Sequence, residues 1–187
     1  DTRMKIVRSE DGMDHAIWQQ FAELGLLAAP FSEEMGGLDG GPVETMVIME
    51  ELGRGLVVEP YLPTIVLCGG ILNRHGAAAQ KEAYLPGIIA GENIWALAFN
   101  EPQGRFNLAD IVTSARVEGD GYVLNGTKAV VLGGPWADKL IVSARISGDQ
   151  RDREGVGLFI VDKSADGVST QDYPTVDGGR AREVTPE

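Results

Sequence analysis

The sequence predicts an α+β protein, with an all-α helical domain over residues 1–93 and an antiparallel β-sheet or partial barrel over residues 94–187. Apolar residues recur every three or four positions in the first half, which is the period of an amphipathic helix. The second half has short β-branched runs separated by glycine-containing turns, which is typical of antiparallel sheets. The polar stretch NEPQGRFNLAD, residues 100–110, follows this change of pattern and is therefore a candidate functional loop.

Four helices are predicted in the first half, over residues 14–29, 42–55, 61–76 and 77–92. In the first, residues spaced three or four apart form one apolar face: Ile17, Phe21, Leu24 and Ala28. Asp14 is its predicted N-cap, and Pro30 ends it.

The second predicted helix opens with Pro42 in its first turn and repeats apolar residues at Val43, Met46, Val47 and Met49. The third is apolar on nearly all sides, so we expect it to be buried. Its inner glycines, Gly69 and Gly70, predict close contact with a neighbouring helix.

Strands are predicted at residues 94–99, 139–146 and 155–162, with a weaker one at 167–173. Residues 111–134 contain two hairpin signals, Asp120-Gly121 and Asn125-Gly126, with β-rich residues on either side. Hairpins at this spacing predict an antiparallel arrangement and argue against a parallel sheet with crossover helices.

Composition limits the possible partners and location. The net charge of −12 disfavours binding to nucleic acid and to anionic lipid. No apolar run approaches the ~18 residues of a membrane span, so we expect a soluble protein without one. The single cysteine, Cys68, excludes an internal disulfide and lies in an apolar context, which predicts a buried side chain. A reducing compartment fits this composition, and we expect a cytoplasmic location.

Common catalytic motifs do not occur: the sequence has no GxGxxG, GxxxxGK[ST], HExxH or CxxC. His15 and His75 lie far apart on or beside predicted helices, so neither is predicted to be a base or a metal ligand, and no metal site is predicted. Residues 125–127 match a glycosylation sequon, but we interpret the Asn-Gly pair as a turn.

Both ends of the sequence are unusual. The chain begins at Asp1 without an initiator methionine, and it ends shortly after the strand-like segment REVT without a closing turn. We expect that either end can be a cut in a longer chain, so functional residues can lie outside this sequence.

The order of these features resembles the acyl-CoA dehydrogenase family. The matching motifs are Glu101-Pro102, the segment GYVLNG at 121–126 followed by Lys128, and Ala137-Asp138. The resemblance covers the family's helical N-terminal domain and most of its middle β domain, and it implies that the family's C-terminal helical bundle is absent from this chain. Within the family, the segments GGPVETM, EPYL and VVLGG…ADKLIVSAR are most similar to the small-subunit type of pimeloyl-CoA dehydrogenase.

The resemblance implies a flavin reaction of fatty acid metabolism. In this family a carboxylate removes the α proton of an acyl-CoA thioester while hydride passes from Cβ to FAD. The carboxylate comes from the C-terminal domain, so no catalytic residue is assigned in this chain, and Glu101 takes the motif's structural position. The implied partners are an acyl-CoA substrate, an electron-transfer acceptor protein and further subunits of a homo- or hetero-oligomer.

By position in the family pattern, FAD contacts fall on Leu97, Phe99, Asn100, Phe106, Val130 and Leu132. The family usually has Thr-Glu-Pro, small residues and then Ser-Asp in this loop, so several polar side chains are replaced here. Asn100 keeps hydrogen-bonding capacity, whereas Phe106 and Leu132 lack a hydroxyl. The alternative for the loop is structural, with Phe106 covering the end of the sheet and Arg105 as a solvated cation.

Three functions remain open at this point. The chain can be part of an FAD-dependent acyl-CoA dehydrogenase, and is then expected to be inactive alone. It can be a non-catalytic partner subunit of a heteromeric dehydrogenase, which the lost hydroxyls favour. It can also belong to another flavoenzyme on the same scaffold, such as an oxidase or a hydroxylase. The acyl chain length is not determined, although the pimeloyl-type resemblance suggests a dicarboxylic acyl-CoA.

Overall fold

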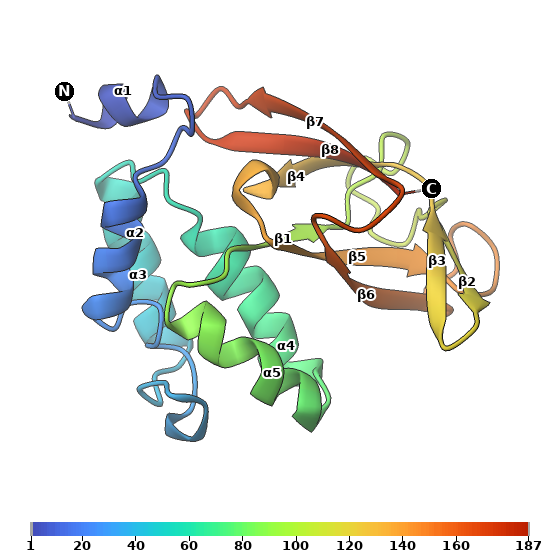
Figure 1. Ribbon diagram of the computed structural model, residues 1–187, viewed down its shortest axis with the longest axis horizontal. Helices are drawn as coiled ribbons and strands as arrows, with labels where there is room; N and C mark the ends of the chain where they lie inside the picture. The colour runs from blue at the N-terminus through green and yellow to red at the C-terminus, as the bar shows by residue number, and fades with distance from the viewer. Residues whose placement is uncertain (1, 187) are drawn as a thin grey trace. The chain divides into compact units, whose positions relative to one another are not determined.

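The computed structural model describes residues 2–186, and by internal contacts the chain divides into two compact units. The first unit is Asp1–Ile94 with Val176–Gly179, and the second is Trp95–Thr175 with Arg180–Glu187. All the α-helices precede residue 90, and all the strands follow it. The predicted α+β class is therefore confirmed (Figure 1).

The helical unit has α1 Thr2–Val7, α2 His15–Glu23, η1 Glu33–Met35, α3 Pro42–Arg54, η2 Leu62–Gly69, α4 Gly70–His75 and α5 Ala78–Ile89. The predicted N-cap of α2 is confirmed, because the Asp14 side chain accepts hydrogen bonds from the backbone N–H groups of Ala16 and Ile17. η2 is a π-helix that leads directly into α4, and both lie beside α5 (Figure 1).

Two predictions for this unit need correction. α2 ends at Glu23, six residues before the predicted end, because Gly25 adopts a φ of 77° that no helix continues. Leu24 is consequently exposed and does not belong to a buried face. The predicted apolar flank of α3 also faces solvent in part, since Val43, Met46 and Val47 are exposed.

The buried character of segment 61–76 is confirmed. Tyr61, Ile65 and Cys68 are fully buried, and burial raises the pKa of the Cys68 thiol. A Cβ on Gly69 would lie 2.6 Å from Cζ of Phe31, so the absence of a side chain there permits a close approach to that ring. Within residues 2–186, no helix is both long and apolar enough to cross a bilayer.

The second unit consists of two sheets. Its strands are β1 Trp95–Ala98, β2 Ser114–Glu118, β3 Gly121–Asn125, β4 Lys128–Leu132, β5 Lys139–Arg145, β6 Val156–Asp162, β7 Val168–Pro174 and β8 Arg180–Pro186. The larger sheet has the order β1-β5-β2-β3, with β6 also paired to β5. The smaller sheet has the order β4-β8-β7 (Figure 1).

Most strand pairs are antiparallel, as predicted, but β1 runs parallel to β5, with Trp95 opposite Lys139. β2 also meets β5 in parallel through one pair, Ser114 and Arg145. The parallel pair forms because the chain leaves β1, passes through β2, β3 and β4, and re-enters the sheet at β5 from the same end. This connection is long enough for parallel pairing without a crossover helix.

Only one of the two hairpin signals forms a hairpin. β2 and β3 pair antiparallel with Glu118 opposite Gly121, so the turn residues are Gly119 and Asp120, one position earlier than predicted. The Asn125-Gly126 prediction is wrong, because β4 pairs with β8 and not with β3. Gly126 lies where the chain leaves β3 of the larger sheet for β4 of the smaller one. A Cβ at this position would lie 2.6 Å from Cα of Thr113, so the absence of a side chain permits this close backbone approach.

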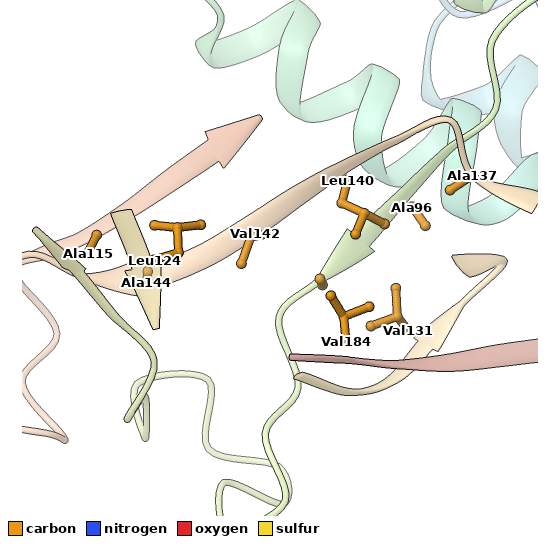
Figure 2. Close-up of a cluster of buried hydrophobic side chains, with 10 residues drawn as sticks. Ala96, Ala115, Leu124, Val131, Ala137, Leu140, Val142, Ala144 and Val184 are labelled. Atoms are coloured by element: carbon orange, nitrogen blue, oxygen red, sulfur yellow. The ribbon is translucent and has the colours of Figure 1, made fainter. Parts of the chain in front are cut away.

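The core of this unit lies between the two sheets. Figure 2 shows Ala96, Leu140 and Val142 of the larger sheet together with Val131 and Val184 of the smaller one. The small side chains on β1 and β5 allow the sheets to approach closely, which removes apolar surface from water at both faces. This packing holds the ends of β1 and β4, where the candidate site lies.

Candidate functional site

Glu101 fixes the polar loop that follows β1. Its Oε1 lies 2.6 Å from Nζ of Lys128 on β4, and the two side chains are 2% and 0% exposed. The same carboxylate accepts hydrogen bonds from the backbone N–H groups of Val112, at 2.7 Å, and Thr113, at 3.1 Å. Gln103 Nε2 donates a further bond of 2.8 Å. One carboxylate therefore holds both ends of the loop.

The electrostatics of this pair favour a fixed ionic state. Burial alone would raise the pKa of Glu101, but the hydrogen bonds from Lys128 and from the backbone outweigh it and lower the pKa to about 2. Burial lowers the pKa of Lys128, and Glu101 acts against that shift. Lys128 Nζ also donates to Oγ of Ser143, at 3.1 Å. The carboxylate is thus enclosed by donors, which suits a structural role better than proton abstraction.

A second carboxylate, Asp110, connects the end of this loop to the loop between β5 and β6. Arg151 Nε donates to its Oδ2 at 2.8 Å, and Gln150 Nε2 donates to its Oδ1 at 2.5 Å. These hydrogen bonds, that from Gln150 first, lower the pKa of Asp110. Asp110 therefore connects two loops, and its carboxylate, like that of Glu101, accepts hydrogen bonds from neighbouring side chains.

Arg145, at the end of β5, joins the same two loops from inside. Its guanidinium is buried, and its hydrogen-bond acceptors within residues 2–186 are all backbone carbonyl oxygens, those of Ala109, Ile111, Ser147, Gln150, Asp152 and Glu154. Five N–H donors in a rigid plane allow one side chain to organise several carbonyls at once. Sequence reasoning missed this residue, since an arginine at a strand end carries no local signal for such a role.

An open hollow lies between these two loops. It has a volume of about 400 Å³ and is lined by Asn107, Leu108, Ala109, Arg153 and Val156. Arg153 has no hydrogen-bond or ion-pair partner among residues 2–186. The hollow thus combines an apolar wall with one available cation, a combination that suits a ligand with both an apolar part and a negatively charged group.

Five of the six residues predicted to contact the cofactor lie on two segments that are adjacent in the structure. Leu97, Phe99 and Asn100 lie in or directly after β1 and are half-buried. Val130 and Leu132 lie on β4 and are 46% and 42% exposed. The two segments are adjacent, because the carbonyl oxygen of Asn100 accepts a hydrogen bond from the backbone N–H of Ala129, at 2.9 Å. We call the surface formed by Phe99, Asn100, Val130 and Leu132 the β1–β4 wall.

Phe106, the sixth residue, does not pack on this wall. Its side chain is 100% exposed, so it packs on no other side chain of the described residues. The structural alternative, in which Phe106 covers the end of the sheet, is therefore not what the described chain shows. Its neighbour Arg105 has a φ of 49°, so the loop turns sharply at this point.

Val130 has an unusual backbone. Its φ is 53°, and its backbone N–H donates a hydrogen bond of 3.0 Å to the hydroxyl of Tyr173 on β7. The backbone N–H of Val130 is therefore engaged by Tyr173, which leaves its carbonyl oxygen and its side chain for any contact with a cofactor. The sequence did not predict a role for Tyr173 either, because this residue lies in the weakest of the predicted strands.

Comparison with known proteins gives two matches that together span the chain. Residues 2–92 match the family profile "Acyl-CoA dehydrogenase, N-terminal domain", and residues 96–186 match "Acyl-CoA dehydrogenase, middle domain". The mitochondrial isovaleryl-CoA dehydrogenase of Pongo abelii is 39% identical over 157 residues, which is 82% of this chain and 37% of that protein. The chain thus spans well under half the length of this relative.

Two solved structures have a closely similar fold. The ChsE4-ChsE5 complex from Mycobacterium tuberculosis superposes with a TM-score of 0.86 at 26% identity, covering 98% of this chain and 48% of the other. The FAD complex of PigA gives a TM-score of 0.88 at 25% identity, covering 100% of this chain and 49% of the other. The first is a complex of two proteins, and the second contains FAD.

Proposed function

Because the chain belongs to the acyl-CoA dehydrogenase family, we propose that it supplies the N-terminal and middle domains of an FAD-dependent acyl-CoA dehydrogenase. The reaction introduces a double bond between Cα and Cβ of an acyl-CoA thioester. The activity belongs to a larger protein or assembly, since the relatives are about twice as long as this chain. An electron-transfer protein is the proposed acceptor of the electrons.

The residues of the β1–β4 wall fit a flavin. Val130 and Leu132 present exposed apolar side chains, and Phe99, on the adjacent segment, is half-buried, so a flat aromatic ring system would cover apolar surface there. The side-chain amide of Asn100 makes no hydrogen bond to any residue in 2–186, so its donor and acceptor are free for a polar ring edge. When bound, FAD supplies the hydride acceptor. This chain orients it and keeps water from one face.

The hollow between the loops is the proposed acyl-CoA side of the site. Ala109 lines it directly before the buried Asp110, so the Ser of the family's Ser-Asp pair falls more naturally on Ala109 than on Phe106. Neither residue has a hydroxyl, so the polar side chains that line the hollow are Asn107, from this loop, and Arg153, from the loop between β5 and β6. Arg153 is available to a phosphate or carboxylate of the substrate.

The chain's own carboxylates near the wall do not qualify as the base. Glu101 is enclosed by donors, and Asp110 is held by Gln150 and Arg151. We therefore propose that proton abstraction depends on a carboxylate outside this sequence. The role of this chain is to position substrate and cofactor. This positioning lowers the activation barrier of the reaction only when the base is also in place.

The observation that carries the proposal is the hydrogen bond between Asn100 and Ala129, which sets the two halves of the wall side by side. The test is to purify the full chain with its natural partner, measure bound FAD by absorbance, and assay acyl-CoA substrates with an artificial electron acceptor. Retained FAD and turnover of at least one acyl-CoA would support the proposal. Protein that binds no FAD under any condition would refute it.

The second candidate is a non-catalytic partner subunit in a heteromeric dehydrogenase. The loss of hydroxyls at Leu132 and in the loop after β1, where Ala109 precedes Asp110, favours it, as does the likeness to one chain of a two-protein complex. The finer resemblance to the small-subunit type of pimeloyl-CoA dehydrogenase supports the same candidate and a dicarboxylic acyl-CoA. FAD stoichiometry distinguishes the two: an active subunit binds one FAD per chain, and a non-catalytic one leaves its own wall empty.

A further inference from the structure

Val130 is a strained residue at a functional surface. Among the non-glycine residues of positive φ in 2–186, which are Asp39, Leu56, Arg105 and Val130, only Val130 is β-branched. A branched side chain is the least compatible with this backbone region, so something must hold it there. Val130 is also half exposed, so its side-chain packing does not provide the restraint.

A bulge in β4 produces this conformation. Lys128 lies opposite Val184 and Val131 lies opposite Arg182, so β4 advances three residues while β8 advances two. The extra residue changes the alternation of faces: Lys128 and Val131 are both buried although they are three apart. Val130, inside the bulge, donates its N–H to the Tyr173 hydroxyl.

Tyr173 reaches Val130 from two strands away. In the smaller sheet Leu132 lies opposite Ala181, and Ala181 lies opposite Tyr173. Ala181 is fully buried and has only a methyl side chain, so a phenol ring extending from β7 meets little obstruction on its way to β4. The hydroxyl then accepts the backbone N–H of Val130, which lies inside the bulge.

We propose that Tyr173 is a positioning residue for the flavin: by holding the Val130 N–H, it maintains the bulge that turns Val130 and Leu132 outward. Without this restraint β4 can return to regular pairing, and a one-residue slip exchanges the two faces of a strand. Val131, 1% exposed, would then face outward, and Val130 and Leu132 would turn inward. This inference rests on the proposed function, since it assumes that the wall binds FAD.

The test compares Tyr173→Phe with Tyr122→Phe in the full chain with its partner. Tyr122 is a matched control: it is partly exposed on β3, its ring packs on Phe159, and its hydroxyl has no partner among the described residues. Tyr173→Phe should speed hydrogen–deuterium exchange over residues 128–133, weaken FAD binding by roughly two- to tenfold, and alter the visible spectrum of the bound flavin. Tyr122→Phe should change none of these.

A rescue variant separates positioning from simple stability. Glycine adopts a positive φ without strain, so Val130→Gly should need the hydroxyl less. The FAD penalty of Tyr173→Phe should therefore shrink in the Val130→Gly background. A penalty of equal size in both backgrounds would contradict the proposed route through Val130.

The outcomes distinguish this inference from the proposed function. Unchanged exchange over 128–133, or faster exchange with unchanged FAD affinity and spectrum, would overturn the inference and leave the flavin proposal standing. If the wild-type protein binds no FAD, the proposed function fails, and the inference fails with it. Faster exchange together with weaker FAD binding and an altered flavin spectrum is the result that supports it.

Discussion

Glu101 and Lys128 form a fully buried ion pair, with 2.6 Å between Oε1 and Nζ, that joins the loop after β1 to the first residue of β4. These are the two segments that form the β1–β4 wall. The pair is surrounded by further donors and acceptors, Val112, Thr113 and Ser143, so neither charge is left without partners. It is therefore a structural connection between the two halves of the candidate site.

Lys128→Met should be strongly destabilising, because it leaves the Glu101 carboxylate buried without its counter-ion. Breaking one side of a buried pair typically costs about 3–5 kcal/mol. The matched control is Arg116→Met, which removes an exposed ion pair with Glu118 in the same unit and should cost at most about 1 kcal/mol. Urea unfolding of the three proteins measures both values, and similar losses for the two variants would contradict the structural role.

The stability of the protein should depend on the ionisation of Glu101 at low pH. Its pKa is about 2 in the folded protein against a usual value of 4.5, so the unfolded state takes up the proton first as pH falls. The stabilisation is fully present above about pH 4.5 and is lost progressively down to about pH 2. Glu101→Gln should therefore show a smaller fall in unfolding free energy across this window. An identical pH dependence would show that Glu101 is not linked to folding.

Arg145→Lys should loosen the two loops that Arg145 joins. An ammonium group cannot reach the carbonyls that the planar guanidinium contacts, and hydrogen bonds to charged groups contribute roughly 1.5–3 kcal/mol. We expect a loss of about that size in unfolding free energy and faster proteolysis within residues 147–155. Arg153→Lys, an exposed change on the same loop, should stay within about 0.5 kcal/mol of wild type. Resistance to proteolysis equal to wild type would argue against the proposed role of Arg145.

Phe106→Ser should separate folding from cofactor contact. The ring packs on no described side chain, so its removal should change stability by no more than about 0.5 kcal/mol without FAD. If Phe106 contacts the flavin, the melting shift produced by saturating FAD should change. The measurement is a pair of thermal melts with and without FAD. An unchanged FAD-induced shift would remove Phe106 from the proposed site.

Local sequence signals predicted the fold class, the Asp14 cap and the β2–β3 hairpin, because each depends on residues close together in the chain. The hairpin predicted at Asn125-Gly126 was wrong because the pairing of β4 depends on a strand that is distant in the sequence. The residues around it favour a hairpin, but β4 pairs with β8, which lies some fifty residues further along the sequence. A turn dipeptide cannot show which strand will arrive as the partner.

The candidate site likewise has features that the sequence predicted and features that it could not predict. Resemblance to a family predicted a structural position for Glu101, which its buried ion pair with Lys128 supports. It also predicted cofactor contacts on the β1 and β4 segments, and that stays a prediction. The strain at Val130 could not be predicted, since a valine in an apolar run favours regular strand geometry. Arg145 and Tyr173 were equally hidden, because their roles depend on contacts with backbone groups from other strands and loops.

The central claim, that the β1–β4 wall binds FAD, is tested most directly by titrating FAD into wild type, Leu132→Arg and Val117→Arg in the full chain with its partner. Leu132 and Val117 are both exposed strand residues of the same unit, so neither change should disturb the fold. We predict that Leu132→Arg weakens FAD binding by about tenfold or more, equivalent to about 1.4 kcal/mol, and that Val117→Arg binds like wild type. Equal FAD affinity of Leu132→Arg and wild type, with all three proteins folded, would contradict the account.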